Sequence, residues 1–222
     1  MPSIRDLFEE LLAKHGQQGW WPLLEQNSSG SWECCYHPGE YQYPDTEEQK
    51  LEICLGAILT QNTNWQNTVK ALINLKQADL MKPEKLAALA PAELAQLIKS
   101  SGYFNQKTRK IKGLVQFWPS LQGRIPSRAE LLNIWGIGPE TADSILLYAF
   151  KMPVMVIDKY TFRVFEAMGL GELPYNYEHL RKTCEIALPE NYRVLQEFHA
   201  LLDAEGKMIT LPDKIQKNYS EY

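Results

Sequence analysis

The sequence has no excess of positive charge. Its 222 residues include 23 Lys and Arg against 27 Asp and Glu, which gives a formal net charge of −4. A protein that coats DNA through bulk charge carries basic residues over its whole surface, so that class is excluded. A protein that binds nucleic acid through one small positive face is not excluded. With 45% hydrophobic and 23% charged residues, the composition is that of a folded globular protein.

Long apolar runs and paired cysteine motifs are also missing. No segment approaches about 18 uninterrupted apolar residues, so we expect no transmembrane helix and no membrane partner. The N-terminal segment has a helical apolar stripe where a signal peptide has a basic start and an apolar centre. We therefore expect a cytoplasmic protein, associated with the nucleoid if the source is bacterial. The four cysteines, Cys34, Cys35, Cys54 and Cys184, have no CxxC spacing, which favours reduced and mostly packed thiols.

Helix signals dominate the chain and strand signals are nearly absent, so we predict an all-α fold. A capping-box pattern at 45–49 precedes the segment 49–60, which is apolar on most of its circumference and should form a deeply buried helix. The segment 24–45 is polar and rich in turn residues, which predicts a surface loop or a hairpin-like excursion. Residues 153–157 are expected to form an extended connection. Further helices are expected from about 65, after Pro83 and Pro91, over 106–117, after Ser127, from 140, after Asp158, and over 176–187 and 190–204.

The most informative segment is 131–165. Gly136-Ile137-Gly138 lies between two predicted helices, where glycines permit a tight turn and close approach of another backbone. The amides at the start of the next helix predict an anion site that needs no side-chain charge. Asp158 follows 20 residues after Gly138, at a helix start. Its carboxylate could stabilise a developing positive charge, or it could serve only as a helix cap.

These features together resemble the helix–hairpin–helix DNA glycosylases of the endonuclease III superfamily. Three ordered blocks carry the resemblance: the hairpin with Thr141-Ala142 and Asp158, LGAILTQNTNWQNTVKAL at 55–72, and SSGYFNQKTRKIKGL at 100–114. The resemblance implies two helical lobes that flank a DNA-facing cleft. One would be a barrel-like lobe at 46–150, with the helix–hairpin–helix at about 128–149. The other would combine 1–45 with 151–222.

The resemblance also implies roles for individual residues. The damaged base would be flipped out of double-stranded DNA and hydrolysed with the help of Asp158. Gln61 would fill the vacated space and Tyr103 would wedge the duplex, although either could be an ordinary cap or surface residue. The expected DNA-binding residues are Gln61, Asn62, Tyr103, Gly136, Gly138, Glu140 and Lys159. A basic cluster beside the wedge, consisting of Lys107, Arg109, Lys110 and Lys112, could contact phosphates or form a solvated helix face.

Three departures narrow the subfamily. Glu140 stands where strand-cleaving relatives have a nucleophilic Lys, and a carboxylate cannot form a Schiff base with the sugar. Only Cys184 lies in the C-terminal third, so no iron–sulfur cluster is expected. No metal-ligand pattern is visible, although the family's hairpin can hold a monovalent cation through carbonyl oxygens. Trp20-Trp21-Pro22 and the VIDKY segment at 156–160 are similar to the 3-methyladenine DNA glycosylase III group, whose base pocket is lined by aromatic side chains.

We therefore expect a monomeric, monofunctional DNA N-glycosylase for an alkylated purine such as 3-methyladenine. Such a base is cationic and would stack on the substrate-binding residues Trp20, Trp21 and Pro22, with His199 and Lys207 behind them. Both Trp residues could instead belong to the core. Two alternatives stay open: a glycosylase for another damaged or mismatched base, and a non-catalytic helix–hairpin–helix DNA-binding protein.

Overall fold

The computed structural model describes residues 3–170 and 176–210, which form two compact units. Unit 1 comprises the described residues up to Trp20, the segment His37–Tyr41, and those from Lys151 onward. Unit 2 comprises Trp21–Tyr36 and Gln42–Phe150. The sequence prediction grouped all of 1–45 with 151–222. Most of the segment after Trp20 belongs instead to unit 2, because its apolar side chains are buried there.

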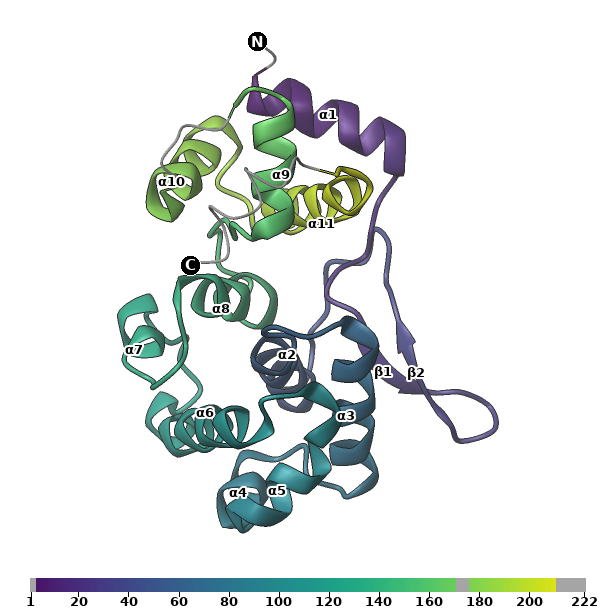
Figure 1. The fold of residues 1–222 in the computed structure, drawn as a ribbon, viewed down its shortest axis with the longest axis vertical. Helices are drawn as coiled ribbons and strands as arrows, with labels where there is room; N and C mark the ends of the chain where they lie inside the picture. Colours follow the sequence, from purple (N-terminus) through teal and green to yellow (C-terminus); the bar gives the residue numbers. More distant parts are fainter. Residues whose placement is uncertain (1–2, 171–175, 211–222) are drawn as a thin grey trace. The chain divides into compact units, whose positions relative to one another are not determined.

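Unit 2 is a helical array arranged around the buried helix α2 (Figure 1). Every residue of α2 from Leu51 to Leu59 is buried, as the apolar pattern of 49–60 predicted. Its helices are α2 (Glu47–Leu59), α3 (Trp65–Gln77), α4 (Pro83–Ala88), α5 (Pro91–Leu97), α6 (Phe104–Phe117), α7 (Arg128–Leu132) and α8 (Pro139–Ser144). Short 3₁₀ helices occupy Lys99–Ser101 and Trp118–Leu121, and α8 continues into a π-helical turn at Ile145–Ala149.

A two-stranded antiparallel sheet is the β structure of the described residues. Strand β1 (Leu23–Gln26) pairs with β2 (Trp32–Cys35), with Leu23 opposite Cys35 and Gln26 opposite Trp32. This confirms the hairpin-like excursion predicted within 24–45. Leu23 and Leu24 are buried, and the backbone N–H of Leu24 donates to Glu52 of α2 at 2.6 Å. The sheet is therefore attached to unit 2 through β1.

Unit 1 is built from four helices: α1 (Ile4–His15), α9 (Lys159–Ala167), α10 (Tyr177–Ala187) and α11 (Tyr192–Met208). Helix α11 packs against both α1 and α9. At its C-terminal end Gly206 lies so close to Tyr160 that a Cβ there would approach the carbonyl oxygen of Tyr160 to 2.6 Å. In the described part of the chain, no helix is long and apolar enough to span a membrane.

The side chains that start these helices explain why the sequence signals located them. Thr46 accepts a hydrogen bond from the backbone N–H of Gln49 at the start of α2. Ser127 and Glu130 form a reciprocal capping box at the start of α7. Residues 153–157, predicted to form an extended connection, lie outside helices and strands, and all four cysteines are free thiols. The predicted all-α class is confirmed.

Candidate active site and nucleic-acid interface

The hairpin between α7 and α8 has two glycines with different geometry. Gly136 has φ of +80°, a left-handed conformation that disfavours side chains. Ile137 is buried and its N–H donates to the carbonyl of Ile134 at 3.0 Å, which closes the turn. Gly138 is extended, with φ −92° and ψ −179°, and is the cap residue of α8. Both glycines and Glu140, in the first turn of α8, are exposed. The tight turn therefore presents backbone at the protein surface.

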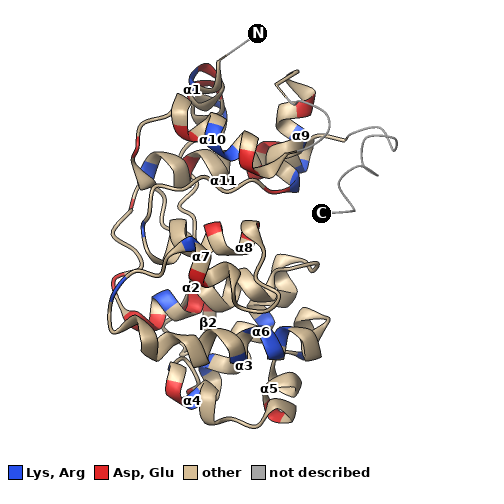
Figure 2. Cartoon of the chain, turned by 90° about the vertical axis from the view of Figure 1, so that its left-hand side faces the viewer, with Lys and Arg blue, Asp and Glu red and all other residues tan. Residues whose placement is uncertain are grey.

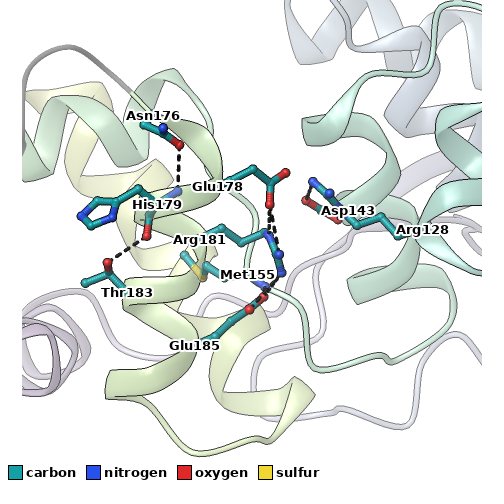
Figure 3. Close-up of polar contacts among 9 residues, drawn as sticks. All are labelled: Arg128, Asp143, Met155, Asn176, Glu178, His179, Arg181, Thr183 and Glu185. Atoms are coloured by element: carbon teal, nitrogen blue, oxygen red, sulfur yellow. Dashed lines mark hydrogen bonds and ion pairs between the residues drawn. The ribbon is translucent and has the colours of Figure 1, made fainter.

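A buried ion pair holds the two helices of this hairpin together. Arg128 of α7 makes two parallel hydrogen bonds to Asp143 of α8, at 2.7 and 3.0 Å (Figure 3). Asp143 is fully buried, so removal of Arg128 would take away the cation that pairs with a carboxylate out of contact with water. The paired geometry fixes the approach of α7 to α8 and with it the shape of the turn.

Gln61, predicted to enter DNA, is bound to the hairpin in this structure. Its amide nitrogen donates to Thr141 Oγ1 at 2.7 Å and to the carbonyl of Gly136 at 3.4 Å. Its Oε1 accepts a hydrogen bond from Lys110 Nζ. Gln61 therefore connects the end of α2, helix α6 and the hairpin. The predicted contact with DNA would require the side chain to leave these partners, and it remains a prediction.

Four exposed residues of unit 2 have a positive φ that few side chains adopt: Asn62, Asp79, Tyr103 and Gln122. Two of them, Asn62 and Tyr103, are predicted DNA-binding residues. Tyr103, the cap of α6, has φ 43° and ψ 32°, and its side chain is 65% exposed. Asn62 is exposed with φ of +51°. Left-handed geometry is tolerated by Asn but costs a tyrosine about 1–2 kcal/mol. Tyr103 is therefore exposed in a strained conformation, and its role as a wedge remains a prediction.

The basic cluster on α6 does not face solvent as a group, and this corrects the sequence interpretation. Lys107 is 1% exposed and donates to the carbonyls of Leu59 and Ser101 at 2.8 and 2.6 Å. Lys112 donates to three carbonyls at the C-terminal end of α4, those of Leu86, Ala87 and Leu89. Lys110 binds Gln61. Only Arg109 of the four is exposed. The positive residues of α6 in Figure 2 therefore serve mainly as internal donors.

Asp158 lies at the start of α9 and uses one of its two carboxylate oxygens to cap that helix. Oδ1 accepts from Tyr160 N at 3.0 Å, from Thr161 N at 2.7 Å and from Thr161 Oγ1 at 2.9 Å. Among the described residues no hydrogen bond falls on Oδ2, and Asp158 is half-buried. Capping and catalysis are thus compatible, because the second oxygen can face a reacting atom. The neighbouring Lys159 is exposed, with Nζ 4.8 Å from the centroid of the Tyr160 ring.

The extended segment before Asp158 is fixed by packing and by one ion-pair network. Residues 154–157 are buried. The N–H of Met155 donates to Glu185 of α10 at 2.9 Å, and Arg181 lies between Glu185 and Glu178 (Figure 3). Asp158 therefore occupies a fixed position within unit 1.

Trp20 faces a group of ionisable side chains on α11. Its indole is 5.9 Å from the imidazole of His199, edge to face, and Lys207 Nζ lies 5.6 Å from the centroids of both Trp20 and Tyr160. Lys207 also binds the carboxylate of Asp203. Burial lowers the pKa of His199, against the opposing effect of Asp158 and Asp203. Burial raises the pKa of Asp203, and the negative charge of Asp158 adds to that effect.

The support of Trp20 comes from the segment His37–Tyr41. Gly19 has φ of +69°, and its carbonyl accepts the N–H of His37 at 3.1 Å. A Cβ on Gly19 would lie 2.3 Å from the backbone nitrogen of Pro38. Tyr41 then donates its hydroxyl to Glu197 of α11 at 2.9 Å, and Glu197 also accepts the N–H of Gln18 at 2.6 Å. The segment therefore holds the backbone on both sides of Trp20.

The structure separates Trp20 from the other two residues of the predicted aromatic pocket. Trp21 is 8% exposed and packs in unit 2 against Trp65 and Tyr148, with ring centroids 5.5 and 5.3 Å apart. Its ring also lies against Gly56, where a Cβ would come within 3.2 Å. Pro22 is buried beside it. Trp21 thus has a packing role in unit 2, and a contact of Trp21 or Pro22 with substrate remains a prediction.

Sequence reasoning did not identify Asp203, although a signal was present. His199, Asp203 and Lys207 are spaced four residues apart and so lie along one face of α11. The same rule accounts for Lys107, which stands four residues before the buried Ile111. A charged residue in register with an apolar stripe indicates an internal partner.

No group of three or more His, Cys, Asp or Glu in the described residues could hold a metal ion. The carbonyls of Ile134 and Gly136 each accept one hydrogen bond, from Ile137 and Gln61. A carbonyl oxygen has a second lone pair, and a monovalent cation at the hairpin remains a prediction. Such an ion would add positive charge there.

Comparison with known proteins identifies the family. Residues 55–190 match the HhH-GPD superfamily of base excision DNA repair proteins. The chain is 33% identical over 210 residues to a Methanocaldococcus jannaschii protein assigned by name as a DNA repair glycosylase, covering 90% of this chain and 84% of that one. The chain therefore belongs to the HhH-GPD superfamily.

Two solved structures share its architecture. The H. pylori 3-methyladenine DNA glycosylase MagIII, bound to 1,N6-ethenoadenine, has 25% identity and a TM-score of 0.71, with 95% of this chain and all of that chain covered. A trapped endonuclease III–DNA covalent intermediate has 18% identity and a TM-score of 0.70, with 96% and 90% covered, and supports the fold alone. The resemblance seen in the sequence is confirmed: the protein is a DNA glycosylase of the endonuclease III superfamily.

Proposed function

We propose that this chain is a monofunctional DNA N-glycosylase that removes an alkylated purine, such as 3-methyladenine, from double-stranded DNA. It would act as a monomer, in the cytoplasm and at the nucleoid if the source is bacterial. The observation that carries the proposal is a half-buried indole packed against the ionisable side chains of α11: Trp20 lies 5.9 Å from His199 and 5.6 Å from Lys207, which binds Asp203, and Asp158 belongs to the same unit. The ligand bound to the H. pylori relative is itself a modified adenine.

The charge of this group suits a cationic base. The two carboxylates of Asp158 and Asp203 outnumber the one amine of Lys207, and burial raises the pKa of Asp203. The lowered pKa of His199 favours its neutral form. A purine alkylated on a ring nitrogen is positively charged and would be attracted both by this charge and by the face of Trp20. A neutral base would gain only the stacking energy.

Asp158 would act on the sugar. Cleavage of the N-glycosidic bond develops positive charge on the anomeric carbon, which a nearby carboxylate stabilises. The helix cap fixes Oδ1, so Oδ2 is the atom that could orient a water or accept its proton. An alkylated purine leaves as a neutral base, which removes the need for a strong general acid.

The proposed absence of lyase activity rests on Glu140. The carboxylate occupies the first turn of α8, where it cannot act as the amine nucleophile of a strand-cleaving enzyme. Ser144 Oγ donates to the carbonyl of Glu140 at 2.7 Å, so this residue also belongs to the helix framework. The expected product is an intact strand with an abasic site.

The substitution Asp158→Asn tests the mechanism. The amide oxygen of Asn can still cap α9, so the fold and duplex binding should persist, while base release falls by about 10²–10³-fold because the negative charge is gone. Release would be measured by chromatography of free bases from a duplex treated with a methylating agent. The matched control is Asp6→Asn in the capping box of α1, which should release base at the normal rate. Undiminished release by the Asp158 variant would refute the mechanism.

The same assay tests substrate and lyase activity. Duplexes containing 1,N6-ethenoadenine, an oxidised guanine or a mismatched thymine would be compared with the methylated duplex. Release of the oxidised guanine or of the mismatched thymine, with none from the methylated and etheno duplexes, would contradict the assignment to alkylated purines. Strand breaks before alkali treatment, or a covalent adduct trapped by borohydride, would overturn the monofunctional assignment.

A further inference from the structure

An exposed aromatic side chain directly precedes the hairpin. Trp135 is 47% exposed, although tryptophan is seldom left in solvent without a role. The guanidinium carbon of Arg109 lies 3.8 Å from the centroid of its indole ring. At this distance the planar guanidinium is stacked on the ring, held by cation–π attraction.

Arg109 differs from the other three basic residues of α6. The ammonium groups of Lys107, Lys110 and Lys112 donate to carbonyl or amide oxygens of the protein. Arg109 is exposed, and in the part of the chain that the structure describes it forms no ion pair with a carboxylate. Its charge and its N–H donors are therefore available at the surface while its orientation is fixed by Trp135.

The stacked pair borders the hairpin on two sides. Trp135 is the residue before Gly136, and Arg109 precedes Lys110, whose side chain covers Gly136 closely enough that a Cβ there would lie 2.5 Å from Lys110 Cε. A phosphate bound at the exposed backbone of the hairpin would therefore have the next phosphate of the same DNA strand near Arg109.

We propose that Arg109, oriented by Trp135, contacts a backbone phosphate of duplex DNA beside the hairpin. The guanidinium presents a fork of donors that matches two phosphate oxygens. Because one face of the guanidinium rests on the indole, little side-chain freedom is lost on binding. The contact adds a side-chain charge to the backbone amides in a protein whose net charge is −4. This inference rests on DNA binding and is independent of the base that is excised.

The test is the salt dependence of binding to an undamaged duplex, measured by fluorescence anisotropy. Arg109→Ala should weaken binding about 3- to 10-fold and lower the slope of log K against log salt by about one. Trp135→Ala should weaken binding about 2- to 5-fold, whereas Trp135→Phe, which keeps an aromatic face, should stay within about twofold. The double variant should be no weaker than Arg109→Ala, since the two side chains act as one unit.

The control is Arg193→Ala, which removes another exposed arginine near aromatic rings, 5.7 Å from the Tyr192 ring and 6.0 Å from the Tyr41 ring. It should leave the slope unchanged. An equal effect of Arg193→Ala would show that bulk charge, rather than this contact, is measured. Normal binding by Arg109→Ala would overturn the phosphate contact. Normal binding by Trp135→Ala would overturn the role of Trp135 in orienting Arg109. Thermal unfolding of each variant separates these outcomes from loss of fold.

Discussion

The two glycines of the hairpin are needed for different reasons. Gly136 has a positive φ, and a Cβ would meet the side chain of Lys110, so the folded protein itself requires glycine there. Gly138 has an ordinary extended conformation, and no atom lies within 4 Å of where its Cβ would be. Nothing in the fold of the described residues accounts for glycine at 138. We propose that glycine at this position leaves space for an approaching phosphate.

Alanine at these two positions should therefore separate stability from binding. Gly136→Ala is expected to lower the free energy of unfolding by about 1–3 kcal/mol, from strain and from displacement of Lys110. Gly138→Ala should change it by less than about 0.5 kcal/mol yet weaken duplex binding about tenfold. Thermal unfolding and anisotropy measure the two quantities. Normal DNA binding by a stable Gly138→Ala protein would count against a phosphate contact at this glycine.

At the scale of single residues, the sequence predicted what local chemistry dictates. The position of Asp158 at a helix start and the tight turn at Gly136 follow from cap and turn preferences, and both are present. The inward lysines of α6 were missed, because the partners of Lys107 are the carbonyls of Leu59 and Ser101, contributed by other elements. The core position of Trp21 likewise depends on Trp65 and Tyr148. Register along a helix indicates that such a side chain points inward, but it does not identify the partners that other elements contribute.

Among the elements, α11 carries most of the chemistry of unit 1. One face presents His199, Asp203 and Lys207, while Glu197 holds the segment His37–Tyr41. Two causes raise the pKa of Tyr41 to about 12: burial, which is the larger, and the hydrogen bond to Glu197. This phenol is therefore a titratable anchor between a loop and a helix.

The anchor predicts a pH dependence of stability. Tyrosine in the unfolded chain ionises near pH 10, whereas the folded protein keeps this proton to about pH 12. The stabilisation is fully present below pH 10 and is lost as the pH rises from 10 to 12. Urea unfolding should show wild type more stable than Tyr41→Phe at pH 8.5, with the difference shrinking towards pH 12. Tyr103→Phe, at an exposed side chain, is the control, and a constant difference for Tyr41→Phe would contradict the prediction.

Helix positions were largely predictable, but one irregularity was not. The starts of α2, α7 and α9 follow from the caps Thr46, Ser127 and Asp158. The helix predicted from 140 widens into a π turn at Ile145–Ala149, where every residue is buried. No cap, glycine or proline marks this change, because it depends on how the buried side chains fit their neighbours.

At the scale of the whole molecule, neither compact unit is one continuous stretch of chain. The chain crosses between the units four times, after Trp20, Tyr36, Tyr41 and Phe150. Unit 2 therefore includes a sequence-distant piece, Trp21–Tyr36, that contributes Trp21, Leu23 and Leu24 to its buried residues.

Two fragments should show how much that piece contributes. A fragment of residues 21–150 should unfold cooperatively, whereas 42–150 lacks the buried Trp21, Leu23 and Leu24 and should lose on the order of 5 kcal/mol, comparable to the whole stability of a domain. Thermal unfolding followed by circular dichroism compares them. Shortening the exposed turn at 28–30 within the longer fragment is the control and should have little effect. Equal midpoints for the two fragments would contradict the account.

The pairing of α1 with α11 also has a consequence in time. The ion pair between His15 and Glu205 joins residues 190 positions apart, so α1 leaves the ribosome long before its partner exists. All the residues of unit 2 have been synthesised by Phe150, and its contacts span shorter loops. During synthesis unit 2 can therefore fold first, whereas the apolar face of α1 cannot pack against α11 until α11 has been synthesised. The hairpin of the nascent chain would therefore be in place before Trp20 and Asp158 could form their site.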